Sequence, residues 1–297
     1  MRIQKIAAGI SIVALITSSA IAPSGASEFT ESKMQLVKTF TGSLSPKSVA
    51  ASQNGLVSAH NMMYSHSVSI FDAQSLELMK TVKDTVDFKA LGVPGFSGKH
   101  KGAPVEGAYS PDGKYLYFTN YAMYGSGFTK EGHDTCSPAS GYDKSYLSRI
   151  NLETFEIDAV YPVGAVPKVV KVTPDNKYVL VSNWCSYTVS VISVEEQRLV
   201  KTIKIGRYPR GIAISANSSY AYVAEMGGNN IHRIDLSDFS KTLIPIGSNP
   251  RAVELSPDNK ILYATLNISG KVIAWDLETN KKIKSVTTGS SARSLAV

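Results

Sequence analysis

The sequence predicts an all-β protein, a β-propeller of four-stranded blades, from three observations. A repeat of about 40 residues recurs in register, and the glycines that open it are spaced 42, 41 and 42 residues apart: Gly164, Gly206, Gly247 and Gly289. Such a period, with several short strands in each repeat, is typical of propeller blades. The repeats are rich in Tyr, Val, Ile, Ser and Thr, which favour strands. Beyond residue 26, no stretch has apolar residues three and four apart over ten positions, as a helix would require.

The repeat that begins at Gly164 shows how one blade is built. Four β-rich runs are expected to form strands at residues 169–173, 178–182, 188–192 and 198–203. Pro174, Asp175 and Asn176 separate the first two runs, and these residue types favour a tight turn. Gly206 and Pro209 then turn the chain into the next blade.

Two earlier blades have longer loops. The first extends over residues 46–81 and the second over residues 104–160. Residues 87–102, ahead of the second blade, are rich in Gly, Pro and Lys. Inside that blade, residues 122–145 hold four glycines and a proline, so we expect an inserted loop there. The chain thus contains five blades and the start of a sixth.

The N-terminal segment has the features of a signal peptide. A positive start at Arg2 and Lys5 precedes an apolar run that is short for a membrane span, and a small-residue cleavage motif ends at Ala26. We therefore predict a signal peptide at residues 1–26, a propeller domain at residues 27–297, and no membrane span after cleavage. Cleavage would leave 29 basic and 24 acidic residues, a net charge of +5. This mild excess favours anionic partners, although scattered surface lysine explains it equally well.

The two ends of the predicted propeller do not complete a blade. Residues 35–40 resemble a fourth strand and residues 292–297 a first strand, whereas propellers commonly close by building one blade from both ends. We therefore expect a larger propeller, truncated at the C-terminus and complete at seven blades, which would need on the order of 70 more residues. This expectation includes an open-sided, poorly soluble product when the 297-residue chain is made alone.

These motifs resemble the YVTN-repeat family of β-propellers, which includes YncE-like proteins. The resemblance covers residues 41–297 and depends on the segments Ser110–Gly113, Tyr117–Asn120 and Thr188–Ile192 and on the Gly-x-x-Pro entries at Gly206 and Gly247. It implies an extracytoplasmic, often cell-surface, propeller with a binding role. Blades four and five depart from the family at its strand-end Asn, where Glu225 and Leu266 stand.

One structural position carries basic residues in five of six repeats. The residue after each entry proline, or after Ala292 in the last repeat, begins the innermost strand; the second blade has Val105 next to Glu106, and the others have Lys47, Lys168, Arg210, Arg251 and Arg293. A ring of cations at the channel mouth would bind carboxylate or phosphate, because Arg offers paired donors in a fixed geometry. The alternative is a relic of blade duplication, with the residues capping neighbouring carbonyls.

The loops between strands two and three share a second composition. Five residues there are candidate ligand contacts: Asn61, Asn120, Tyr121, Asn183 and Trp184. With nearby Met and Tyr residues they would form an aromatic wall around the basic mouth, suited to a sugar or a partner chain. Alternatively, these side chains pack together with the insert as a local core.

Cysteine, histidine, methionine and glutamate side chains are the remaining candidates for chemistry. We predict a Cys136–Cys185 disulfide, since both residues lie in strand two-to-three loops of adjacent blades in an exported chain. A copper site is a weaker alternative, drawn from the soft ligands His60, Met62, Met63, His66, Met123 and His133 without a fixed spacing. Glu106 is interpreted as a salt-bridge partner of Lys47 or Lys168 rather than as a general base.

The sequence favours a non-enzymatic, extracytoplasmic binding propeller in the periplasm or at the cell surface, with no cofactor, no metal and no catalytic residues. Its loop face would engage an anionic glycan, a small anionic metabolite or a protein partner; nucleic acid fits the charge but is not specifically indicated. Two alternatives stay open: a lactonase-like or other hydrolytic propeller, and a structural surface module without a small ligand. The fold alone does not choose among them.

Overall fold

The computed structural model describes residues 35–297. The predicted signal peptide, residues 1–26, lies outside the described residues. The chain divides into two units, Met1–Thr39 and Phe40–Val297. The described part of the first unit, residues 35–39, contains neither helix nor strand, and the second unit holds every described element.

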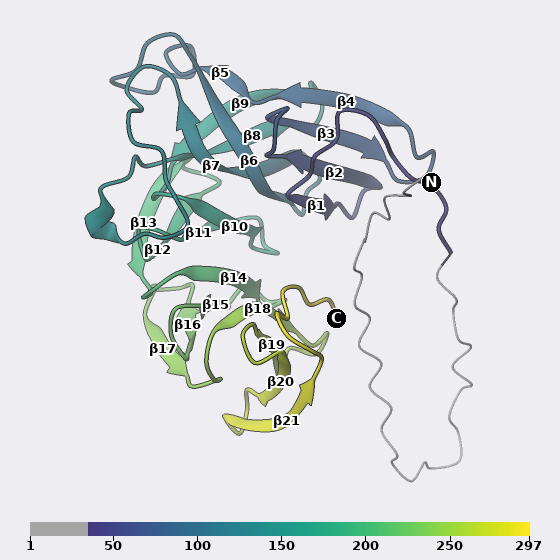
Figure 1. Cartoon of the computed structure of the whole chain (residues 1–297), viewed down its shortest axis with the longest axis vertical. Helices are drawn as coiled ribbons and strands as arrows, with labels where there is room; N and C mark the ends of the chain where they lie inside the picture. Colours follow the sequence, from purple (N-terminus) through teal and green to yellow (C-terminus); the bar gives the residue numbers. More distant parts are fainter. Residues whose placement is uncertain (1–34) are drawn as a thin grey trace, which may run out of the picture. The chain divides into compact units, whose positions relative to one another are not determined.

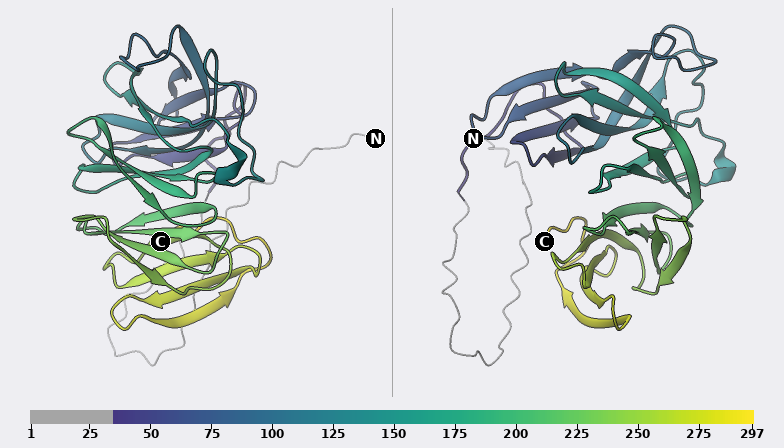
Figure 2. Two further views of the ribbon diagram at one scale, coloured as in Figure 1. Left: turned by 90° about the vertical axis from the view of Figure 1, so that its left-hand side faces the viewer. Right: turned by 180° about the vertical axis from the view of Figure 1, so that it is seen from behind.

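The second unit contains five antiparallel sheets that follow one another in chain order (Figures 1 and 2). The first blade has the strand order β1-β2-β3-β4: β1 Ser48–Ala51, β2 Leu56–Asn61, β3 Ser67–Asp72 and β4 Leu78–Lys83. The second has five strands and one 3₁₀ turn: β5 Thr85–Asp87, β6 Lys99–Tyr109, β7 Tyr115–Tyr124, η1 Pro138–Ser140, β8 Tyr146–Asn151 and β9 Glu156–Pro162.

The last three blades have four strands each, in chain order. The third contains β10 Pro167–Val172, β11 Tyr178–Asn183, β12 Thr188–Ser193 and β13 Arg198–Lys204. The fourth contains β14 Pro209–Ile214, β15 Tyr220–Glu225, β16 Ile231–Asp235 and β17 Lys241–Ile244. The fifth contains β18 Pro250–Leu255, β19 Ile261–Leu266, β20 Lys271–Asp276 and β21 Lys281–Thr287. The predicted all-β class with repeated four-stranded blades is confirmed.

The turn between the first two strands is built the same way in each of these blades. In the third, the Thr173 hydroxyl bonds Asp175 and accepts the backbone N–H of Tyr178, while Asn176 takes the left-handed conformation at φ 58°. Ser or Thr, Asp or Asn, and a residue that tolerates positive φ therefore close a short hairpin.

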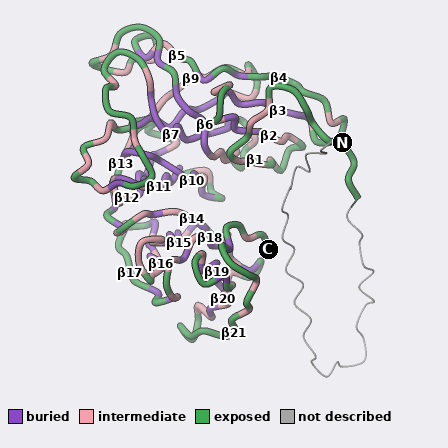
Figure 3. Tube along the Cα trace, viewed as in Figure 1, coloured by how far each residue is buried: buried purple, intermediate pink, exposed green. Residues whose placement is uncertain are grey.

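The core lies between blades, where neighbouring sheets pack face to face. Leu180 and Val191 of the third blade pack with Ile212 and Val223 of the fourth, and equivalent clusters join the other successive pairs. Figure 3 shows burial along the middle strands and exposure along outer strands such as β21, every residue of which is exposed or intermediate. Successive apolar residues of a middle strand thus point to opposite faces of its sheet and pack against the blade on either side.

The second blade is larger than the sequence predicted. The Gly-, Pro- and Lys-rich stretch at residues 87–102 ends in the first part of β6, which pairs with β5 at Thr85 with Lys101 and at Asp87 with Lys99. The loop prediction for residues 122–145 is wrong only at its start, because β7 continues to Tyr124. An aromatic cluster around the buried Phe88 supports this extension.

The strands predicted at residues 35–40 and 292–297 are not formed. Both segments lie outside the five sheets of the described residues. Phe40 instead packs its ring on Phe71, with centroids 4.6 Å apart. Ser291 nevertheless has the positive φ of the residues before the other entries, Tyr208 and Asn249.

Candidate functional site

Strand β6 of the second blade and the first strands of the other blades converge on a cavity of about 470 Å³. Its lining comes from β1, β6, β10, β14 and β18 and from residues 293–295. Among the described residues that line it are five cations, Lys47, Lys171, Arg210, Arg251 and Arg293, and two carboxylates, Glu106 and Glu254. The lining therefore carries three more positive than negative charges.

Three arginines at the same repeat position face this cavity from consecutive repeats. Burial, followed by the charges of Arg210 and Arg293, lowers the pKa of Arg251 to about 10. Burial also lowers the pKa of Arg210, which Glu106 opposes. Like charges held together without full compensation favour an incoming anion.

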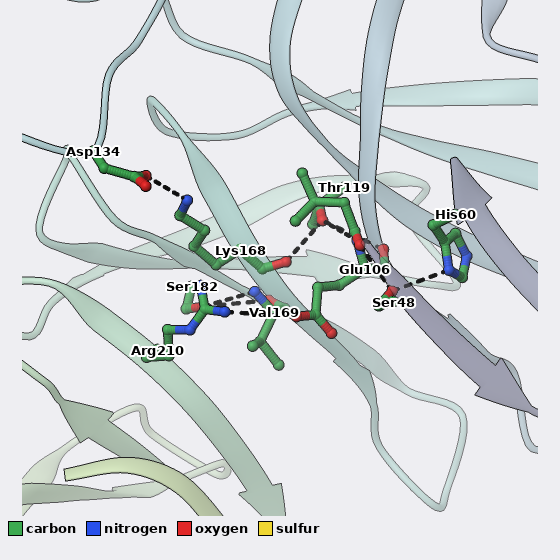
Figure 4. Close-up of polar contacts among 10 residues, drawn as sticks. Ser48, His60, Glu106, Thr119, Asp134, Lys168, Val169, Ser182 and Arg210 are labelled. Atoms are coloured by element: carbon green, nitrogen blue, oxygen red, sulfur yellow. Dashed lines mark hydrogen bonds and ion pairs between the residues drawn. The ribbon is translucent and has the colours of Figure 1, made fainter. Parts of the chain in front are cut away.

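Glu106 is one of the two carboxylates that line the cavity. Its Oε1 lies 3.9 Å from Nη2 of Arg210, and Figure 4 shows the two side chains pointing toward each other. Burial raises the pKa of Glu106, while Arg210 acts against this rise. The expected partners were Lys47 or Lys168; the structure pairs Glu106 with Arg210 instead. The contact is too long for a hydrogen bond, so the guanidinium keeps donors for a ligand.

Aliphatic side chains and a second charged pair also line the cavity. Val169 and Val253 belong to the lining, and Nζ of Lys171 lies 3.6 Å from Oε1 of Glu254. Sequence reasoning missed this pair because Lys171 and Lys168 do not share the alternation of a regular strand. A bulge between Pro167 and Val170 shifts the register and lets Lys171 face the cavity.

Lys168, the ring position of the third blade, does not line the cavity. Its Nζ bonds Oδ1 of Asp134 at 2.7 Å and lies over the ring of Tyr121, 4.4 Å from the centroid. In Figure 4 its side chain points away from Glu106, toward the insert. The structure thus brings four of the five predicted ring cations together: Lys47, Arg210, Arg251 and Arg293.

The three candidate asparagines are fully buried; Asn61 and Asn183 end strands β2 and β11, and Asn120 lies within β7. Nδ2 of Asn183 donates to Thr188 and Ser190, and its Oδ1 accepts the backbone N–H of Gly164. Asn61 and Asn120 make the corresponding bonds to Ser69 and Ser148. The structure gives these side chains internal partners and does not place them on the cavity.

The positions that Asn183 and Ser190 occupy in the third blade hold different residue types in the fourth and fifth blades. Blade four has Glu225 and His232, whose side chains lie 3.2 Å apart, and Glu225 accepts the backbone N–H of Arg207. Blade five has Leu266 opposite the strand that carries the apolar Ile273. Where blades four and five lack the strand-end Asn, its partner Ser is therefore replaced as well.

Tyr121 and Trp184 belong to a local core beside the mouth. Trp184 stacks on Tyr208 with centroids 4.4 Å apart, and its indole N–H donates to the backbone oxygen of Asp134 at 2.8 Å. Lys168 lies on the same indole, 5.6 Å from its centroid. These contacts support local packing with the insert, the alternative left open by the sequence.

The predicted Cys136–Cys185 disulfide is present, with Cα atoms 5.4 Å apart. It joins the insert of blade two to the strand two-to-three loop of blade three. The backbone oxygen of Cys136 also accepts the hydroxyl of Tyr187 at 2.9 Å. The end of the insert is therefore fixed to blade three by covalent and polar contacts.

The three histidines considered for copper each make a hydrogen bond within the protein. Nδ1 of His60 bonds Ser48, Nδ1 of His66 bonds the Gly102 carbonyl, and Nδ1 of His133 accepts the N–H of Thr135. Within residues 35–297, no group of three or more His, Cys, Asp and Glu side chains is arranged to hold a metal ion. The described residues also include no helix long and apolar enough to span a membrane.

Comparisons with known proteins agree with this architecture. The family model "YNCE-like beta-propeller" matches residues 139–219, which contain the third blade and the start of the fourth. Antigen Lp49 of Leptospira interrogans serogroup Icterohaemorrhagiae serovar copenhageni (strain Fiocruz L1-130) is 26% identical over 168 residues, 52% of this chain. The match spans only 34% of that relative's length.

Two solved structures share the fold at low identity. Hydrazine synthase of Kuenenia stuttgartiensis superposes with a TM-score of 0.50 at 17% identity, covering 88% of this chain and 91% of that one. Dihydro-heme d1 dehydrogenase NirN in complex with DHE superposes with a TM-score of 0.55 at 15% identity, covering 81% and 45%. At such identity the likeness concerns the fold alone. The expected resemblance is confirmed: the chain has the β-propeller fold, and residues 139–219 match the YncE-like β-propeller family.

Proposed function

We propose that this protein is an extracytoplasmic binding propeller that holds an anionic group of its ligand in the cavity at the channel mouth. The observation that carries the proposal is the convergence of Arg210, Arg251 and Arg293 on one cavity from equivalent positions. Chance surface lysine would not place like charges together in a partly buried hollow. A repeat relic would explain the shared position but not the net positive lining.

The chemistry of the lining points to a carboxylate or phosphate group. Arginine presents several N–H donors in a plane that matches two oxygens of such a group, and burial strengthens each charged hydrogen bond. Val169 and Val253 offer apolar contact to the rest of a small ligand. The cavity volume of about 470 Å³ is in the usual range for small-molecule sites.

The disulfide supports the extracytoplasmic part of the proposal. Structural disulfides persist in oxidising compartments and are rare in the cytosol. The Cys136–Cys185 bond is such a structural disulfide, because it joins the insert of blade two to blade three. The predicted signal peptide at residues 1–26 agrees with this location.

The test is a comparison of two charge-matched double variants by titration calorimetry with pyrophosphate and with citrate. Arg251→Gln with Arg293→Gln should weaken binding about tenfold or more, because two charged donors are lost. Lys281→Gln with Lys282→Gln removes the same charge from the exposed strand β21 and should change affinity little. The affinity should also fall as the salt concentration rises from roughly 20 to roughly 200 mM, because the added ions screen the attraction between the cavity and the anion. Equal losses in both double variants would reject a specific cavity site.

A further inference from the structure

Asp134 is the acid that removes one cation from the ring. Its Oδ1 bonds Nζ of Lys168 at 2.7 Å, and the Lys168 side chain is only 5% exposed whereas that of Asp134 is 64% exposed. Lys168 is the sole member of the five predicted ring cations, all within the described residues, that does not line the cavity. A carboxylate of the protein itself therefore occupies the place that a ligand's carboxylate would take at this repeat position.

Asp134 is held in this place by contacts of its own segment. Its carboxylate accepts the hydroxyl of Tyr121 at 3.2 Å, and its backbone oxygen accepts the indole N–H of Trp184 at 2.8 Å. Two residues later the Cys136–Cys185 disulfide joins the segment to blade three. The position of the charge is thus fixed by the tether and by neutral donors as well as by Lys168.

The influence of Asp134 extends to the cavity. Burial lowers the pKa of both Arg210 and Arg251, and the negative charge of Asp134 acts against that lowering in each case. The charge of Lys47 in turn acts on Asp134. The charge of Asp134 therefore acts on cations that line the cavity.

We propose that Asp134 is a specificity-determining residue of the anion site, a tethered counter-charge that withdraws Lys168 and limits how much negative charge the mouth accepts. This inference rests on the proposed function. It assigns the insert of blade two a role in ligand selection, since the insert has no counterpart in the other blades. The simpler alternative is that the Asp134–Lys168 ion pair only fastens the insert.

The decisive variant is Asp134→Asn, which keeps the size of the side chain and removes its charge. We expect affinity for pyrophosphate to rise on the order of fivefold at pH 6.5, the effect of removing one partly screened like charge. The matched control is Glu131→Gln, which removes one charge from the same insert, where the carboxylate binds the Tyr124 hydroxyl. Asp134→Ser provides a second test with a smaller side chain.

A double-variant cycle tests the tether. Cys136→Ser with Cys185→Ser should also raise affinity for pyrophosphate, and adding Asp134→Asn to that background should raise it less than in the intact protein. No gain from Asp134→Asn relative to Glu131→Gln, with Arg251→Gln and Arg293→Gln still weakening binding, would overturn this inference and leave the proposed function standing. Unchanged binding in the double arginine variant would overturn the proposed function itself.

Discussion

Oδ2 of Asp84 and Oδ1 of Asn120 face the same point beside Gly102, and neither atom has a hydrogen-bond partner. Oδ2 of Asp84 and Oδ1 of Asn120 are both buried and unpartnered, and they lie 2.3 and 2.4 Å from where a Cβ on Gly102 would be. Burial raises the pKa of Asp84 to about 7, with Lys101 acting against the rise. A proton on Asp84 would supply the donor that this pair of acceptors lacks.

Asp84→Asn should therefore stabilise the protein at pH 8. A carboxyl whose folded pKa is raised keeps its proton below about pH 7, so its ionisation lowers stability as pH rises from about 4 to 7. The asparagine needs no proton and can donate to Asn120. We expect a gain on the order of 2 kcal/mol at pH 8 that shrinks at pH 5, measured by urea unfolding. Glu153→Gln, an exposed site, is the control, and a gain independent of pH would contradict the assignment.

Acid should destabilise the protein through His60. This fully buried imidazole has its pKa lowered to about 4 by burial, while its hydrogen bond with Ser48 opposes the shift. The unfolded chain takes up the proton below about pH 6.5, so stability falls from pH 6.5 to about 4, by up to about 3 kcal/mol from this group. His60→Gln should flatten that part of the profile even if the variant is less stable at pH 7. An unchanged slope would exclude His60 as its source.

The contact between Asn183 and Ser190 should behave as a unit. Asn183→Leu alone leaves the Gly164 N–H and two hydroxyls without their partner and should reduce stability by about 2 to 3 kcal/mol. Adding Ser190→Ile, which reproduces the apolar pair of blade five, should recover part of that loss. Urea unfolding of both single variants and the double variant measures the coupling, and strict additivity would refute it.

Loss of the disulfide should lower stability and loosen the insert. The two cysteines are 49 residues apart, and the chain-entropy account gives about 4 kcal/mol for closing such a loop, less any strain. Cys136→Ser with Cys185→Ser should lower the thermal midpoint and expose residues 125–145 to protease before the blades. Simultaneous cleavage throughout the chain would show that the bond stabilises the whole fold rather than the insert.

The repeat made most of the fold predictable, because the period, the turn residues and the alternating strands recur with each blade. Strand β5 could not be predicted, since Thr85–Asp87 pairs with a lysine- and glycine-containing extension of β6 that has weak strand preference. Residues 35–40 looked like a strand because pattern alone cannot show whether a partner strand is present.

The site was predictable where residues share one repeat position and unpredictable where geometry intervenes. Arg210 and Arg251 were found by alignment of the repeats. Lys171 and Glu254 were missed because bulges in β10 and β18 change which side chains face the cavity. Asp134 was missed because it lies in an insert without a counterpart, so no repeat pattern could indicate its contact with Lys168.

Hydrogen bonds connect adjacent blades at both ends of the innermost strands. Near the mouth, the Thr119 hydroxyl donates to the Lys168 carbonyl at 2.8 Å; at the far end, successive turns bond one another, as Asn176 does with Asp112 and Ala216 with Asn259. These hydrogen bonds oppose both rotation and translation of one blade relative to the next. Because the strands that carry the cations are fixed relative to one another, the protein loses little conformational entropy on binding. The spacing of the negative charges on a ligand must therefore match the spacing of these cations.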